Sequence, residues 1–189
     1  MCDCTRGPGP AGAHRPARRL PPSAADPITA ADQSYFTYYH LDQARAKGYS
    51  GKGVTIALID GEVDTTVPEL AGATIIDKSP CTVTSSPFSK THGTAIASLL
   101  VSKTYGVAPD ATLLTYQTSL ADDGDESGSE CTFRNGNPIE DPTSLINRAI
   151  SDGAQIISIS SSDENFDDAT KWAIARADAL GVIVVSPHG

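Results

Sequence analysis

No stretch of the 189-residue sequence approaches the roughly 20 apolar residues that a membrane-spanning helix needs, because polar residues interrupt the longer apolar runs. Basic residues are also scarce. The chain has 14 Lys and Arg against 23 Asp and Glu, which gives a net charge of −9. A protein with this charge gains little from nonspecific contact with nucleic-acid phosphates. We therefore expect no membrane span and no nucleic-acid partner.

Periodic repeats and a dense cysteine framework are lacking as well. The 16 Gly and 13 Pro follow no fixed period, which excludes a collagen. Cys2 and Cys4 have no matching Cys or His downstream that would complete a tetrahedral zinc site, so we expect no metal and no cofactor. Cys81 and Cys131 lie in polar stretches and are either a disulfide or two free thiols, because spacing alone does not fix the distance between them.

The first 34 residues have the composition of a disordered leader. Residues 1–30 contain four Arg and six of the 13 Pro, with almost no large apolar side chain. They include basic residues like the start of a secretory signal, but the apolar run of roughly 7 to 15 residues is missing, so we expect no export signal. The leader is then a linker, a remnant of a pro-segment or a misassigned start, or else a basic docking arm. One domain follows it, over residues 35–189.

Short β-branched runs alternate with helical apolar spacing along that domain. Strands are predicted at residues 54–59, 74–76, 111–116, 156–159 and 182–185. Helices are predicted from His92 to about 103, from Pro142 after an Asp141 N-cap to Gly153, and from about Phe166 to Gly181. This alternation is typical of βαβ units, so we predict an α/β fold with a doubly wound parallel sheet covered on both faces.

Three polar features lie at predicted strand ends or helix starts. Asp60 follows the first predicted strand, His92 opens a helix, and the triple serine Ser160, Ser161 and Ser162 follows the strand at 156–159. In such sheets the active crevice lies beyond the carboxyl ends of the strands. A carboxylate that orients a histidine, which in turn deprotonates a hydroxyl, is the chemistry of acyl transfer. Taken singly, Asp60 is better explained as a turn-capping carboxylate and His92 as an ordinary residue near a helix N-terminus.

Three blocks of sequence, at residues 51–70, 91–98 and 105–111, follow one another along the chain. Residues 51–64 read Gly-Lys-Gly-Val-Thr-Ile-Ala-Leu-Ile-Asp-Gly-Glu-Val-Asp and run on to Pro-Glu-Leu at 68–70. They resemble the aspartate block of the subtilisin-like serine proteases, or subtilases. Residues 91–98, Thr-His-Gly-Thr-Ala-Ile-Ala-Ser, resemble the histidine block, and residues 105–111 the segment after it. The resemblance covers roughly residues 36–189.

This resemblance implies a subtilisin-like fold and a serine endopeptidase that acts on peptide or protein substrates and is secreted. It implies Asp60 as the orienting acid and His92 as the general base. Ser160, Ser161 and Ser162 match the strand edge on which subtilases bind an extended substrate by backbone pairing. If His92 stands at a helix start, the helix dipole disfavours its protonated form, and the hydrogen bond that the imidazole donates to Asp60 offsets that cost.

Departures from the family pattern set further expectations. Glu62 replaces a usual Gly, and a second carboxylate so near Asp60 is expected to raise one pKa of the pair. Ser161 and Ser162 replace a usual small pair, and His188 replaces a small residue. No Asn follows Gly189 and no serine stands in a GTS-type motif, so we expect a fold incomplete at its C-terminal end, truncated before the nucleophile and inactive as given. The alternative is a noncatalytic peptide-binding module that has lost hydrolysis.

The stretch from 118 to 141 has no periodicity and is predicted to be a surface loop. It is acidic and contains Asp122, Asp123, Asp125, Glu126 and Glu130. These carboxylates either favour Lys or Arg in the substrate, or form a solvated surface. Calcium is a further alternative, because loop oxygens suit that cation, although the spacing matches no calcium loop.

Overall fold

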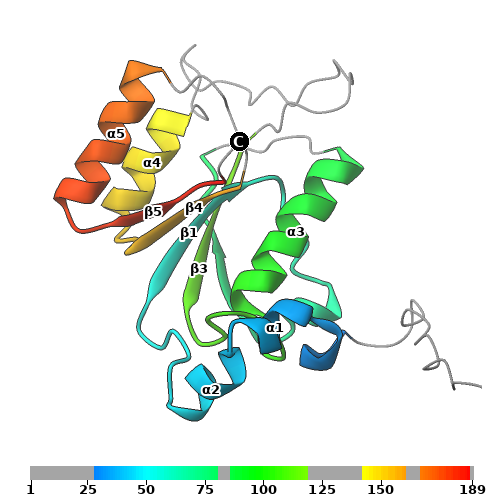
Figure 1. The fold of residues 1–189 in the computed structure, drawn as a ribbon. Helices are drawn as coiled ribbons and strands as arrows, with labels where there is room; N and C mark the ends of the chain where they lie inside the picture. The colour runs from blue at the N-terminus through cyan, green and yellow to red at the C-terminus, as the bar shows by residue number, and fades with distance from the viewer. Residues whose placement is uncertain (1–27, 81–85, 119–141, 161–166, 188–189) are drawn as a thin grey trace, which may run out of the picture.

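The computed structural model describes residues 28–80, 86–118, 142–160 and 167–187. In these ranges five parallel strands form one sheet in the order β2-β3-β1-β4-β5. The strands are β1 (Thr55–Asp60), β2 (Thr74–Asp77), β3 (Thr112–Gln117), β4 (Ile156–Ile159) and β5 (Ile183–Val185). Helices α4 (Pro142–Ser151) and α5 (Asp168–Ala179) cover one face, and α3 (Pro87–Val101) lies on the other (Figure 1). The predicted doubly wound parallel α/β fold is confirmed.

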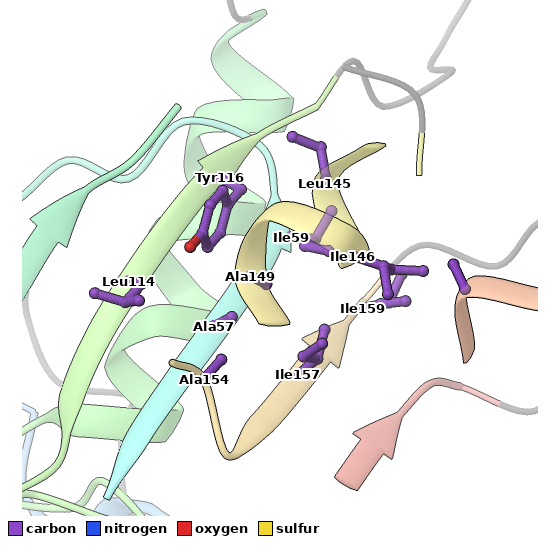
Figure 2. Close-up of a cluster of buried hydrophobic side chains, with 11 residues drawn as sticks. Ala57, Ile59, Leu114, Tyr116, Leu145, Ile146, Ala149, Ala154, Ile157 and Ile159 are labelled. Carbon is purple, nitrogen blue, oxygen red and sulfur yellow. The ribbon is translucent and has the colours of Figure 1, made fainter. Parts of the chain in front are cut away.

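Strand β1 lies at the centre of the sheet and is buried on both faces, which explains its continuous apolar run. Ala57 and Ile59 belong to the core beneath α4 and α5 (Figure 2). Ile56 and Leu58 belong to the core beneath α3. Because strand side chains alternate between faces, the next residue on the α3 side is Asp60.

Tyr116 on β3 completes the core beneath α4 (Figure 2). It also connects that core to the residue that follows the helix. Its side chain is fully buried, and its hydroxyl donates a hydrogen bond of 2.8 Å to Asp152 Oδ2. Burial, together with the neighbouring Asp152 carboxylate, raises the pKa of the Tyr116 hydroxyl well above its ordinary value of 10.0.

Two helices begin at different residues from those predicted. Helix α3 begins at Pro87, five residues before His92, because the Ser86 hydroxyl accepts a 3.1 Å hydrogen bond from the Ser89 N–H and Pro suits the first helical position. Helix α5 begins at Asp168, and Asp167 caps it by accepting a 2.7 Å bond from the Thr170 N–H. Phe166 and Asp141 lie outside the described residues.

The sequence patterns missed the short helices that precede β1. They are η1 (Ala30–Asp32), α1 (Ser34–Tyr38) and α2 (Leu41–Ala46), and a further 3-10 helix, η2 (Pro68–Leu70), precedes β2. Arg45 on α2 donates hydrogen bonds to the carbonyls of Thr104 and Gly106, just after α3. Residues 28–34 of the expected leader thus include η1 and the first residue of α1, while residues 1–27 lie outside the described residues.

Candidate active site

Asp60 and His92 meet at the carboxyl end of the central strand. Asp60 is fully buried, and its Oδ1 lies 2.8 Å from His92 Nδ1. The same oxygen accepts a 2.6 Å hydrogen bond from the Gly61 N–H. With an ionised carboxylate at that distance, Nδ1 carries the imidazole proton and Nε2 is left as the acceptor. The His92 side chain is 32% exposed, so this acceptor is within reach of a ligand.

His92 lies in the second turn of α3 and not at its start. The field of a helix N-terminus falls off within the first turn, and here that turn begins at Pro87. The expected dipole penalty on the protonated imidazole is therefore wrong. Phe88, one turn earlier on the same helix, stacks on the His92 ring with centroids 6.2 Å apart and planes at 22°.

Two glycines allow α3 to approach the turn after β1. A Cβ on Gly61 would lie 2.3 Å from the Ser89 carbonyl oxygen and equally close to its Oγ. A Cβ on Gly93 would lie 2.4 Å from the Gly61 carbonyl oxygen. No side chain fits at either position without moving backbone, so the glycines beside Asp60 and His92 set the distance between them.

Polar contacts from the next turn of α3 hold the segment that follows Asp60. The Thr94 hydroxyl accepts a 2.9 Å bond from the Asp64 N–H and donates a 2.6 Å bond to the Lys90 carbonyl. Lys90 Nζ lies 2.9 Å from Glu62 Oε1 and 3.8 Å from Asp64 Oδ2. The Glu62 carboxylate raises the pKa of Lys90, and hydrogen bonds from Thr66 lower the pKa of Asp64.

These contacts assign Glu62 a partner that sequence reasoning missed. The Glu62 charge is paired with Lys90 on α3 instead of standing alone beside Asp60. Lys90 is separated from Glu62 by 28 residues, and nothing in the sequence pattern joins them. Gly61, Gly93 and Thr94, in contrast, stand inside the sequence blocks at 60–64 and 92–94 that point to the family. The sequence therefore signals these three residues.

The chain matches a known family over most of its length. Residues 51–189 match the Subtilase family, Peptidase S8. The chain belongs to this family. A curated relative, Minor extracellular protease Vpr of Bacillus subtilis (strain 168), is 32% identical over an alignment of 168 residues that covers 80% of this chain and 19% of Vpr.

Two solved structures have a similar fold. The structure of the prenylagaramide maturation protease PagA is 21% identical with a TM-score of 0.55, over 77% of this chain and 49% of that one. The PatG macrocyclase domain is 16% identical with a TM-score of 0.62, over 86% and 64%. This subtilase chain thus spans about half of PagA and about a fifth of Vpr.

The remaining site residues of this subtilase are only partly described. Ser160 is half-buried and lies one position beyond the Ile59–Ile159 pair, level with Asp60 on the neighbouring strand. Ser161, Ser162 and His188 lie outside the described residues, as do both body cysteines and the acidic stretch after β3. In the ranges that the structure covers, no three His, Cys, Asp or Glu side chains gather as metal ligands, and no helix is long and apolar enough to cross a membrane.

One buried atom of the site has no hydrogen-bond partner in the part of the chain that the structure describes. Oδ2 of Asp60 makes no hydrogen bond with any described residue, while Oδ1 has two partners. An ionised buried oxygen without a donor is costly, by about 1 to 3 kcal/mol for an ordinary polar group and more for a charged one.

Proposed function

We propose that this chain carries the acid and the base of a subtilase serine endopeptidase, with Asp60 as the orienting acid and His92 as the general base. The observation that carries the proposal is the 2.8 Å contact between Asp60 Oδ1 and His92 Nδ1. Serine protease function is what Subtilase membership supports, and the assignment of these two residues goes beyond it.

The proposed chemistry follows from the geometry of that contact. His92 Nε2 takes the proton of a serine hydroxyl as the hydroxyl oxygen attacks the scissile carbonyl carbon. His92 then gives the proton to the leaving amine. Asp60 remains ionised throughout; it holds the imidazole in the tautomer with Nδ1–H and stabilises the imidazolium that forms.

We further propose that the nucleophilic serine and the oxyanion-hole asparagine are not among these 189 residues, which then hydrolyse no peptide alone. This proposal is supported by the sequence, in which no serine stands in a GTS-type context. Ser160, Ser161 and Ser162 are proposed to bind substrate backbone, and the position of Ser160 level with Asp60 supports that role.

A noncatalytic peptide-binding module is the second candidate. It is favoured by the polar contacts of His92, whose ring bonds to Asp60 alone within the described residues and meets no serine hydroxyl there. Both candidates take a peptide or protein ligand and need no cofactor. We propose secretion as well, because the relative Vpr is named an extracellular protease.

Hydrolysis of a fluorogenic peptide separates these proposals. We expect no turnover by the purified 189-residue chain and turnover by the longer encoded protein, if its reading frame supplies the missing serine. His92→Ala should abolish that turnover. Hydrolysis by the 189 residues that His92→Ala removes would overturn the assignment of the nucleophile. A longer protein with a GTS-type serine that neither hydrolyses peptides nor reacts with a fluorophosphonate would overturn the endopeptidase.

A further inference from the structure

Phe88 is a large apolar side chain that stays exposed beside the candidate general base. It lies one turn before His92 on α3, and the centroids of the two stacked rings are 6.2 Å apart. The residue is 54% exposed, although burial of an aromatic ring ordinarily adds strongly to stability. Phe88 belongs to neither of the two hydrophobic cores of the described residues. Packing of the core therefore does not explain this ring.

The part of α3 around Phe88 is uncharged. Side chains three and four positions apart are neighbours on a helix, and for Phe88 these are Thr91 and His92. Lys90 is the only Lys, Arg, Asp or Glu of α3, and side chains two positions apart do not face each other. Its Nζ is directed instead to Glu62, at 2.9 Å. An apolar group therefore fits against the Phe88 ring better than a charged group.

The proposed reaction brings a substrate within reach of Phe88. His92 Nε2 gives its proton to the leaving amine, so the nitrogen of the cleaved bond comes to about 3 Å from the imidazole. Successive Cα atoms of a peptide are about 3.8 Å apart. Side chains next to the cleaved bond therefore lie at a distance from His92 similar to the 6.2 Å that separates the two rings. One of these side chains can cover the exposed part of Phe88.

We propose that Phe88 is a specificity-determining residue that binds an apolar side chain of the peptide, one or two residues from the cleaved bond. Backbone pairing gives affinity for any extended peptide, and contact with the Phe88 ring adds a preference for apolar side chains. The inference rests on the proposed function in that its ligand is part of a peptide substrate. It uses described residues alone and does not depend on the acidic stretch after β3.

The test measures peptide binding by NMR titration of the 189-residue chain, labelled in its Phe and His rings. The probes are two short, blocked alanine peptides that differ only in a central Leu or Asn, which have side chains of similar shape and volume. We expect the Leu peptide to shift the ring signals of Phe88 and His92 and to bind about tenfold more tightly than the Asn peptide. The preference should persist as salt is raised, because salt does not screen an apolar contact.

Variants assign the preference to the Phe88 ring. Phe88→Ser and Phe88→Gln should each reduce the affinity for the Leu peptide about tenfold, to that of the Asn peptide. Phe88→Tyr keeps the ring and should keep the preference. Trp172→Ser removes an exposed aromatic side chain from α5 and should leave both affinities unchanged. A low-field imidazole proton of His92, retained in the polar Phe88 variants, would show that they keep the contact with Asp60.

The outcomes separate this inference from the proposed function. Equal affinities for the two peptides, no binding of either, or equal effects of Phe88→Ser and Trp172→Ser would overturn the role of Phe88 in specificity. Loss of the low-field proton in both polar variants would also overturn it, because Phe88 would then position His92. Selective binding that depends on Phe88, in a protein whose longer form hydrolyses nothing, would support the inference and overturn the endopeptidase. Hydrolysis with no selective binding would do the reverse.

Discussion

Asp60 Oδ1 lies 2.8 Å from His92 Nδ1, although 32 residues separate the two in the sequence. The contact arises because the last side chain of β1, that of Asp60, lies on the face of the sheet that α3 covers. Gly61 and Gly93 also let α3 approach the end of the strand more closely than any side chain would allow. One oxygen of Asp60 therefore holds both the Gly61 N–H and the imidazole, and this fixes the ring relative to the strand.

The first prediction concerns Asp60 in any form of the protein that hydrolyses peptides. Asp60→Asn should lower kcat by about 10⁴-fold, because an amide at this position stabilises the wrong tautomer and no imidazolium. The effects of Asp60→Asn and His92→Ala should not add, since both residues act in one proton transfer. Steady-state kinetics on the single and double variants measure this, with Asp178→Asn as the control. A double variant much slower than the slower single variant would contradict a shared mechanism.

Gly93→Ala should destabilise the protein, whereas Gly→Ala inside a helix ordinarily stabilises it. The added Cβ would lie 2.4 Å from the Gly61 carbonyl oxygen, so α3 has to move away from the turn. We expect the free energy of unfolding to fall by about 2 kcal/mol, measured by urea denaturation. Thr91→Ala on the exposed side of α3 is the control. A more stable Gly93→Ala variant would show that the approach of helix and turn is looser than described.

Tyr116→Phe should lower the free energy of unfolding by about 1 kcal/mol, because it removes the hydrogen bond to Asp152 from a buried position. Since the pKa of Tyr116 is raised in the folded protein, its contribution is complete below the ordinary value of 10.0 and is lost as pH rises above it. Wild-type stability should therefore fall more steeply in alkali than that of Tyr116→Phe. Tyr38→Phe changes an exposed ring and should match the wild type at every pH.

Asp167 gives a prediction for the thermal stability of the protein at acidic pH. The Thr170 N–H lowers the pKa of this N-cap carboxyl below its ordinary 3.8, so its contribution is present above that value and is lost as pH falls through the lowered one. Asp167→Ala should lower Tm at neutral pH, and the difference from wild type should shrink at acidic pH. Thermal unfolding followed by circular dichroism from neutral to acidic pH tests this. A Tm difference that is independent of pH would show that the cap acts without its charge.

The central strands and the acid–histidine pair could be predicted from the sequence because they leave strong local signals. β1 and β4 are apolar runs that end in polar residues, and the glycines beside Asp60 and His92 mark a close approach. The start of α3 was missed although Ser86 and Pro87 signal it, because the apolar spacing begins only later in the helix. The short helices α1 and α2 have too few residues to show a period.

Contacts between distant charged residues could not be predicted in this way. Lys90 pairs with Glu62 only because α3 lies on the turn after β1, and that placement is a property of the packed fold. A cavity lined by the turn after β1 and by the ends of β2 and β3 is similar, since no sequence pattern brings these three walls together. Which charged residues pair, and which are buried, is therefore decided by tertiary packing between segments that are distant in the sequence.

The tautomer of His92 tests the central claim most directly. NMR of the ¹⁵N-histidine-labelled chain distinguishes the two ring nitrogens and detects a strongly hydrogen-bonded imidazole proton at low field. We predict that neutral His92 carries its proton on Nδ1, with a low-field signal that disappears in Asp60→Asn and persists in Asp178→Asn. A His92 protonated on Nε2, or a low-field signal unchanged by Asp60→Asn, would contradict the assignment of Asp60 and His92 as acid and base of this subtilase.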